Sequence, residues 1–189
     1  DDLGLVTHSA ETEAVAAAAG ATAGDVWFVP ALMGMGTPVW DFGARGALVG
    51  LTQGSGRAEI VRAVLDGVAH RGADLLEAAE ADSGTTVATL RVDGGMSANR
   101  VFVQTLADAC LRPVELSGEL EATTLGAGLL ACVAIGALPG TDVIADSYRP
   151  RAVVEPRLAG AAHRALRTRW LEARERAART VPELSGIEF

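Results

Sequence analysis

The stretch LRVDGGMSANRVFVQTLADAC, residues 90–110, joins an apolar segment to an amphipathic one through a turn that contains two glycines. Apolar residues alternate with other residues over 86–92, which favours a strand. After the turn they recur at helical spacing, which predicts a helix over about 98–110. A strand, a Gly-Gly turn and a helix start in this order indicate an α/β protein.

The turn Asp93-Gly94-Gly95 is a candidate phosphate or nucleotide site. Gly94 and Gly95 allow a ligand to approach the backbone, and the helix start offers free N–H groups at the positive end of its dipole. Asn99, one turn into the helix, can present its amide to a ribose, a base or a phosphate. A purely structural tight turn is the alternative, because the segment is neither a Walker loop nor a dinucleotide fingerprint.

The rest of the chain also alternates between expected strands and helices. Further strands are expected at 26–30, 46–52 and 113–116, further helices at 8–20, 57–81, 123–135 and 159–179, and loops at 31–45 and 140–157. This order predicts an α/β fold.

Three of these helices carry more specific expectations. In helix 57–81, Gly67 and Gly72 are expected to let another backbone approach closely. Helix 123–135 is apolar and rich in small residues, so we expect it to be buried on most of its sides. In helix 159–179, we expect one apolar face, with the arginines and glutamates on the other; that apolar face holds Leu166, Trp170 and Leu171.

Composition limits the possible functions. The chain has 189 residues, of which 49% are hydrophobic and 21% charged, as expected for a single folded domain over 1–189. All 16 basic residues are arginine, and the net charge of −8 argues against a nucleic-acid partner, although backbone N–H groups can still bind phosphate. The most apolar segment, 125–138, is too short to cross a bilayer, and residues 1–10 show no secretory signal. We therefore expect a cytoplasmic protein with no membrane partner.

Other side chains that could carry chemistry are scattered along the chain. Cys110 and Cys132 lie in apolar stretches and are expected to be free, buried thiols, and no metal-ligand spacing is present. We expect structural or exposed roles for the histidines, structural roles for carboxylates near glycine-rich turns, and core or interface roles for the tryptophans. These residues are His8, His70, His163, Asp41, Asp66, Asp93, Trp27, Trp40 and Trp170. No catalytic constellation emerges.

The run VPALMGMGTPVWDFGARGALVGLTQG at 29–54 resembles a region of the FGGY carbohydrate kinases. It has Val-Pro-Ala, Gly-x-Gly-x-Pro-x-Trp-Asp and Ala-Arg-Gly in the family's order, and residues 46–66 fit the second FGGY signature. Residues 90–110 and 121–136 are similar to the family's adenosine-nucleotide segment and to the helix that follows it. The resemblance covers about 3–175, and within the family it is greatest to the glycerol kinases.

The resemblance implies two domains with the actin-like, ribonuclease-H-like ATPase fold. This chain resembles the second, nucleotide-binding domain, and its helix at 159–179 is similar to the helix that ends that domain. Carried over by position, the Gly95 N–H faces the phosphates of ADP or ATP, Asn99 lies nearer the adenosine, and Gly94 is their neighbour. The complete enzyme would use ATP and Mg²⁺ to phosphorylate a hydroxyl of a polyol or sugar.

The same resemblance assigns the catalytic aspartate and the substrate-binding residues to the first domain. It therefore implies no catalytic residue in this chain, which is expected to be inactive alone. Another FGGY kinase such as a xylulokinase, a non-catalytic nucleotide-binding module and an actin-like ATPase without sugar chemistry are the alternatives. The surface that packs on the first domain should be apolar, so self-association is also expected.

Overall fold

A computed structural model describes residues 3–186 of the chain; Asp1, Asp2 and residues 187–189 lie outside the described residues. The strands are β1 (Trp27–Val29), β2 (Ala47–Val49), β3 (Leu90–Val92), β4 (Val114–Ser117) and β5 (Pro150–Val154). The α-helices are α1 (Thr12–Ala17), α2 (Arg57–Ser83), α3 (Arg100–Cys110), α4 (Ala122–Ala134), α5 (Thr141–Ser147), α6 (Gly160–Ala177) and α7 (Pro182–Ser185). Two 3-10 helices, η1 (Ser9–Glu11) and η2 (Gly95–Ala98), precede α1 and α3.

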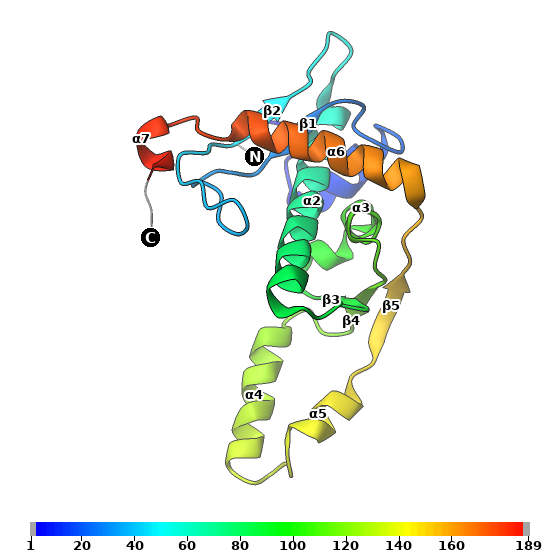
Figure 1. Ribbon diagram of the computed structural model, residues 1–189. Coiled ribbons are helices and arrows are strands. Elements are labelled where there is room, and N and C mark those ends of the chain that lie inside the picture. Colours follow the sequence, from blue (N-terminus) through cyan, green and yellow to red (C-terminus); the bar gives the residue numbers. More distant parts are fainter. Residues whose placement is uncertain (1–2, 187–189) are drawn as a thin grey trace.

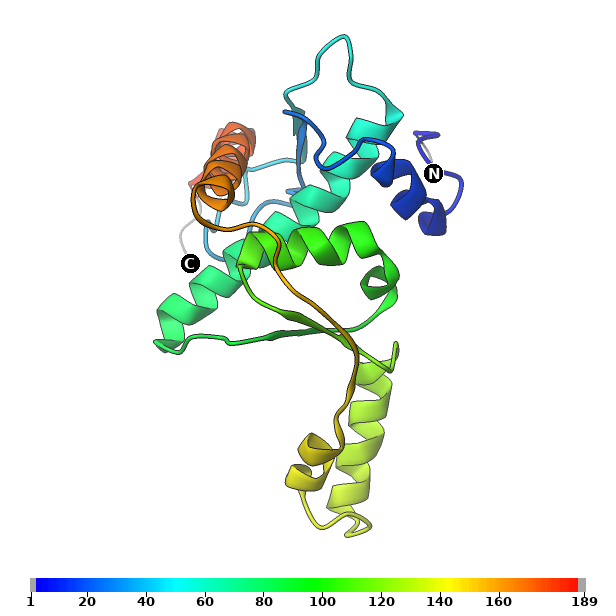
Figure 2. The same ribbon diagram turned by 90° about the vertical axis from the view of Figure 1, so that its right-hand side faces the viewer.

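The strands form two small sheets, so the predicted α/β class is confirmed (Figure 1). β1 and β2 pair antiparallel. The second sheet has the order β3-β4-β5, in which β3 and β4 are parallel and β5 is antiparallel to β4. Helix α3 connects β3 to β4 and lies over one face of this sheet, as Figure 2 shows. Residues 90–117 therefore form a β-α-β unit.

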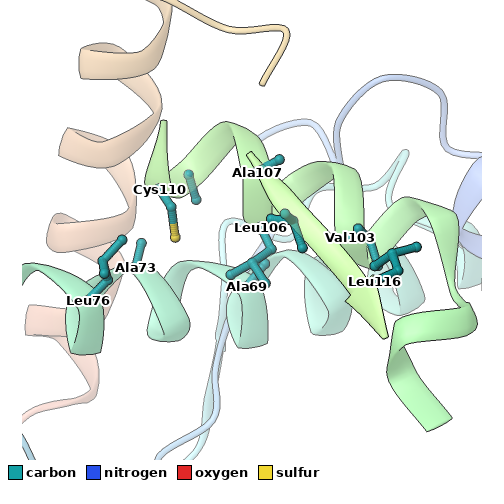
Figure 3. Close-up of a cluster of buried hydrophobic side chains, with 10 residues drawn as sticks. Ala69, Ala73, Leu76, Val103, Leu106, Ala107, Cys110 and Leu116 are labelled. Carbon is teal, nitrogen blue, oxygen red and sulfur yellow. The ribbon is translucent and has the colours of Figure 1, made fainter. Parts of the chain in front are cut away.

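The main core lies between α2, α3 and the three-stranded sheet (Figure 3). Small and medium apolar side chains fill it: Ala69, Ala73, Leu76, Val103, Leu106, Ala107, Ala109, Cys110, Val114 and Leu116. Interiors built from small side chains bring backbones close together, which matches the alanine-rich composition. Burial raises the pKa of the Cys110 thiol to about 12, so this thiol is protonated at neutral pH.

The close approach predicted at the glycines of α2 is confirmed at Gly67. A Cβ atom added there would lie 2.0 Å from the backbone oxygen of Phe28 on β1. At Gly72 the nearest atom is Cδ1 of Leu106, 3.0 Å away, which is a side chain of α3. Only Gly67 therefore brings α2 directly against a neighbouring backbone. Gly84 ends α2 in the left-handed conformation, with a φ of 65°.

The expectation for helix 123–135 is wrong within the described chain. Helix α4 has no buried residue, and Figures 1 and 2 show α4 and α5 extending away from the sheet. The loop expected over 140–157 is also wrong, because that segment contains α5 and β5. β5 becomes a strand by pairing with β4, a tertiary contact that a Pro- and Arg-rich sequence does not reveal.

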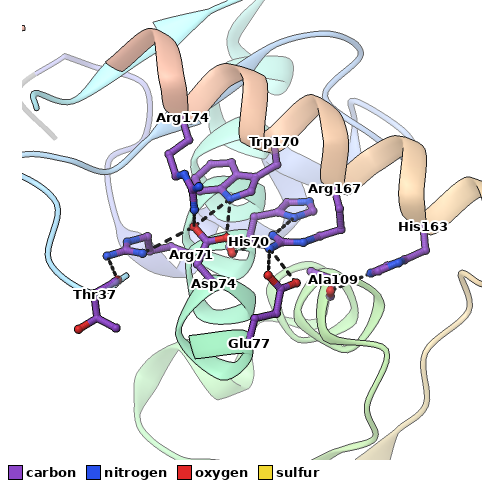
Figure 4. A network of polar contacts seen from close by, with 10 residues as sticks. All are labelled: Thr37, His70, Arg71, Asp74, Glu77, Ala109, His163, Arg167, Trp170 and Arg174. Carbon is purple, nitrogen blue, oxygen red and sulfur yellow. Dashed lines mark hydrogen bonds and ion pairs between the residues drawn. The ribbon is translucent and has the colours of Figure 1, made fainter. Parts of the chain in front are cut away.

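Helix α6 differs from the sequence prediction in which residues it buries. Trp170 is fully buried as expected, but Leu171 is 40% exposed and Arg167 is buried. Figure 4 shows Arg167 and Arg174 reaching from α6 to α2 on the same side as Trp170. The arginines were expected on the opposite face. Arg167 and Arg174 lie here because the buried carboxylate of Asp74 on α2 accepts from both of them.

Smaller differences concern boundaries and exposure. The expected helix over 8–20 consists of η1 and the short α1, and the expected strand over 86–92 is regular only in β3. Cys132 is half-buried rather than buried, while both thiols are free as predicted. Trp40 is 60% exposed and so lies outside the core of the described residues. Among residues 3–186, no helix combines the length and the hydropathy needed to cross a membrane.

Candidate nucleotide-binding site

Two loops leave the same edge of the three-stranded sheet. β3 and β4 are parallel, with Val92 paired to Leu116, so the chain leaves both strands side by side. The loop after β3 contains Asp93-Gly94-Gly95, and the loop after β4, residues 118–121, leads into α4. In open α/β sheets, ligands bind at the carboxyl ends of parallel strands. This edge is therefore the place at which the topology favours a ligand.

The backbone of the glycine turn is open to solvent. Gly94 has a φ of 79°, a conformation that side-chain-bearing residues rarely adopt. A Cβ atom on Gly94 or Gly95 would meet no atom of the described residues within 4 Å. Gly95 also begins η2, and the first N–H groups of a helix have no partner inside it. The turn thus offers backbone donors and the space in front of them.

A buried serine holds this turn in place. The Ser97 hydroxyl donates to the Gly94 carbonyl at 2.7 Å, and the Ser97 N–H donates to the same oxygen at 3.1 Å. Ser97 is 3% exposed. This role of Ser97 is not among the sequence predictions, although a serine near a turn often makes such a side-chain-to-backbone bond.

Asn99 is the N-cap of α3, which begins at Arg100 and not at about residue 98. Its Oδ1 accepts from the Phe102 N–H at 3.0 Å, and its Nδ2 donates to Oγ1 of Thr12 in α1 at 3.1 Å. An amide nitrogen carries two N–H groups, so one donor remains after the bond to Thr12. Asn99 therefore joins α1 to α3 and keeps one hydrogen bond for another partner.

Charged side chains near the turn are few and of both signs. Asp93 is exposed beside Gly94, and Arg91 pairs with Glu115 at 3.1 Å while lying over the Tyr148 ring at 4.2 Å. Within residues 3–186 no group of three or more metal-ligating side chains occurs. Because Mg²⁺ at phosphate sites keeps several waters and binds phosphate oxygens, the chain fits a Mg²⁺ ion carried by a nucleotide rather than by a protein cage.

A groove of about 1280 Å³ runs along α3, but the predicted site residues do not line it. Ser97, Ala98 and Arg100 do, as does Asp66 on α2. Asp66 accepts from Nε of Arg62 at 2.8 Å and from the Thr105 hydroxyl at 2.9 Å. Burial raises the pKa of Asp66, and the positive charge of Arg62 offsets only part of this rise. Asp66 thus ties α2 to α3, in keeping with its predicted structural role.

Asp41 has the structural role predicted for it. Its carboxylate accepts from the backbone N–H groups of Gly43, Ala44 and Arg179 and from the Ser185 hydroxyl, at 2.6–3.1 Å. Burial raises the pKa of Asp41, but these hydrogen bonds outweigh it and hold the pKa below its usual value. Asp41 therefore joins the loop after β1 to the segment that follows α6.

His70 is also structural, as predicted. It is 1% exposed and stacks on Trp170 with an interplanar angle of 18°. Its Nδ1 lies 3.3 Å from Nη1 of Arg167, and since a guanidinium only donates, the neutral ring carries its proton on Nε2. Burial and the Arg167 charge lower the pKa of His70 to about 3. His163 contacts the Ala109 carbonyl at 3.0 Å, and His8 is exposed.

Comparisons with known proteins identify a family for this chain. Residues 3–135 match the FGGY family of carbohydrate kinases, C-terminal domain. The glycerol kinase of Petrotoga mobilis is 40% identical over 183 residues, which is 97% of this chain and 36% of that protein.

Solved structures are similar as well. The structure titled as Plasmodium falciparum glycerol kinase with ADP matches with a TM-score of 0.82 and 27% identity, over 100% of this chain and 36% of that one. The ligand-bound xylulose kinase of Lactobacillus acidophilus matches with a TM-score of 0.73 and 27% identity, over 91% and 36%.

The fold is thus that of an actin-like ATPase, shared with carbohydrate kinases. The chain belongs to the FGGY family of carbohydrate kinases and matches its C-terminal domain. It spans about a third of the length of the curated glycerol kinases that it matches.

Proposed function

We propose that this chain is the nucleotide-binding part of a glycerol kinase-like FGGY enzyme. The complete enzyme would transfer the γ-phosphoryl group of ATP to a hydroxyl of a polyol or sugar. The observation that carries the proposal is the open backbone of Gly94 and Gly95 at the carboxyl edge of β3 and β4. The 40% identity to a glycerol kinase supports the choice of subfamily.

In this proposal the backbone, and not a basic side chain, receives the phosphates. The Gly95 N–H donates to a phosphate oxygen, and Gly94 supplies the conformation that exposes it. The N–H of Asn99 that Thr12 leaves free donates to the adenosine. Mg²⁺ bound to the phosphates would neutralise part of their charge, which would favour binding to a chain with a net charge of −8.

Phosphoryl transfer depends on positioning the acceptor hydroxyl, the metal and the nucleotide together. The family resemblance assigns the catalytic carboxylate and the acceptor site to the other domain. Two of the carboxylates act as structural acceptors: Asp41 in a loop and Asp66 between helices. We therefore expect the chain to bind nucleotide without transferring phosphate by itself.

Calorimetric titration with ADP, with and without Mg²⁺, tests the site. In Gly95→Val the new side chain points into open space, so the fold should persist while the phosphate position is blocked. Gly36→Val is the matched control, because a Cβ atom at Gly36 also meets nothing within 4 Å among the described residues. We expect Gly95→Val to weaken ADP binding at least about tenfold, equivalent to 1.4 kcal/mol, and the control to bind like wild type. Equal affinity in both variants would contradict the site.

A non-catalytic nucleotide-binding module is a second candidate function, because the chain matches only 36% of the length of the Petrotoga mobilis glycerol kinase. The two candidates differ in phosphoryl transfer. The chain is combined with the part of the Petrotoga mobilis enzyme that lies outside the match, and transfer from labelled ATP to glycerol or to xylulose is measured. Transfer to glycerol supports the enzyme, and transfer to xylulose supports a different FGGY kinase. ADP binding with no transfer to either acceptor supports the module.

A further inference from the structure

Thr12, the first residue of α1, lies against the start of α3, although 87 positions separate it from Asn99 in the sequence. The Thr12 hydroxyl donates to the Ser9 carbonyl at 2.6 Å, and the Thr12 backbone N–H donates to the same oxygen. A hydroxyl has one proton to donate and two lone pairs that accept. Its single proton is used here, so toward Asn99 the Thr12 oxygen can only accept.

The side-chain amide of Asn99 is held at both of its ends. Its Oδ1 accepts from the Phe102 N–H at 3.0 Å, and its Nδ2 donates to Oγ1 of Thr12 at 3.1 Å. The terminal torsion of an asparagine is broad, so one hydrogen bond alone leaves the amide plane free to swing. Two hydrogen bonds at opposite ends fix the plane. Because the amide is planar, they also fix the direction of its second N–H, which has no acceptor among residues 3–186.

Helix α1 supports Thr12 without help from the Thr12 hydroxyl. Figure 2 shows α1, in dark blue, beside α2 and α3. Ala16 of α1 is completely buried and packs with Val61 and Leu65 of α2, and two residues from the first turn of α3 lie against the same cluster. Removing one hydroxyl from α1 should therefore leave the helix in place.

We propose that Thr12 is a positioning residue of the nucleotide site, which orients the Asn99 amide so that its free N–H points at the adenosine. Thr12 does not touch the ligand and acts only through Asn99. Because the amide is already fixed, Asn99 loses little side-chain freedom when the nucleotide binds, whereas immobilising a free side chain weakens binding. This inference rests on the proposed function, because it takes Asn99 to contact the nucleotide.

Calorimetric titration of three variants with ADP tests the role of Thr12. Thr12→Val keeps the shape of the side chain but removes the acceptor, and it should weaken ADP binding about fivefold. Thr12→Ser keeps the hydroxyl and should bind ADP like wild type. The control is Glu13→Ala, which removes a different bond between α1 and α3: Oε2 of Glu13 accepts from the Arg100 N–H at 2.8 Å. The control should not weaken ADP binding. An equal loss in Thr12→Val and Glu13→Ala, or a loss that persists in Thr12→Ser, overturns the proposal.

A double substitution tests whether Thr12 acts through Asn99. Residues that act on a ligand through one shared contact have effects that do not add. In an Asn99→Ala background the amide is gone, so adding Thr12→Val should leave the ADP affinity of that background unchanged. A further loss of about fivefold on adding Thr12→Val shows that Thr12 acts by another route and overturns the proposal.

A measurement without nucleotide separates this inference from the proposed function. NMR relaxation of the Asn99 side-chain amide reports its order on the picosecond-to-nanosecond timescale. We expect this amide to be ordered in wild type and in Thr12→Ser, and mobile in Thr12→Val. If the amide behaves in this way but wild type does not bind ADP, the proposed function alone is contradicted. If wild type binds ADP and the amide is equally ordered in all three proteins, this inference alone is contradicted.

Discussion

Trp170 donates its indole N–H to both carboxylate oxygens of Asp74, at 3.0 and 3.1 Å, although both residues are almost completely buried. The same carboxylate accepts from Nη2 of Arg167 at 2.8 Å and from Nη1 of Arg174 at 2.9 Å (Figure 4). A single acidic side chain of α2 thus receives three donors of α6. Asp74 is therefore the carboxylate through which α2 holds the buried face of α6, beside the apolar contacts of Trp170.

Asp74→Asn should be strongly destabilising. The amide keeps the shape of the carboxylate but leaves Arg167 and Arg174 without its charge, and breaking a buried ion pair costs about 3 kcal/mol or more. Urea denaturation measures the loss. The control is Asp25→Asn, which removes an exposed ion pair with Arg169 and should cost less than about 1 kcal/mol. Equal effects of the two substitutions would show that Asp74 does not hold α6.

The sequence predicts the elements of this fold where local signals are strong. Helix α2 begins at Arg57 as expected, because the Gly56 N–H donates to Oε2 of Glu59 at 2.8 Å and so caps its start. α5 and β5 were missed, since β5 depends on pairing with β4. The exposure of α4 could not be predicted either, because its apolar, small-residue composition is that of a buried helix.

For the candidate site, glycine spacing predicts a turn at Gly94 and Gly95, and the structure shows that turn. Nucleotide binding at this turn stays a prediction. The bond from Asn99 to Thr12 could not be predicted, because the two residues are far apart in the sequence and only folding brings them together. The two arginines of α6 that reach Asp74 did carry a signal: Arg167 and Arg174 recur with Trp170 at three- and four-residue spacing and share a helix face.

His70 should make stability depend on pH. Its pKa is about 3 in the folded chain and about 6.5 when unfolded, so the unfolded chain binds the proton first as the pH falls. The stabilising contribution is complete above pH 6.5 and is lost as the pH falls towards 3. Between pH 7 and 5 this single group should lower the free energy of unfolding by about 2 kcal/mol. His70→Gln should remove that loss, whereas the exposed His8→Gln should leave it unchanged; a loss that persists in His70→Gln would point to another group.

Gly67→Ala and Gly72→Ala should differ sharply although both lie in α2. At Gly67 the new methyl group meets the Phe28 backbone oxygen at 2.0 Å, and the helix and β1 must separate, at a cost of about 3 kcal/mol. At Gly72 it meets a flexible leucine side chain at 3.0 Å, and the gain of about 1 kcal/mol in helix propensity offsets the contact. Thermal unfolding of both variants measures the difference. Similar melting temperatures would contradict the close approach of α2 to β1.

The two cysteines should react differently with an aromatic disulfide reagent. Cys110 is buried and its pKa is about 12, so it presents almost no thiolate at pH 8. Cys132 lies half-buried on α4, the helix that stands away from the core. The native chain should therefore release one equivalent of the reagent's aromatic thiolate rapidly. The denatured chain should release two equivalents. Cys132→Ser should abolish the rapid phase, and rapid labelling in that variant would place Cys110 at the surface.

Asn99 has a structural role in the chain and a proposed role toward the nucleotide, and two substitutions separate them. Asn99→Ala removes the N-cap of α3 and should cost about 1 kcal/mol of stability. Asn99→Asp keeps the acceptor for the Phe102 N–H, which suits a helix start, but loses the donor to Oγ1 of Thr12, so it should lower stability less than Asn99→Ala does. Both variants lack the amide donor. If that donor contacts adenosine, calorimetry will show ADP binding weakened in both to a similar degree. If ADP affinity falls in Asn99→Ala and is normal in Asn99→Asp, the residue serves the nucleotide site only by holding α3 in place.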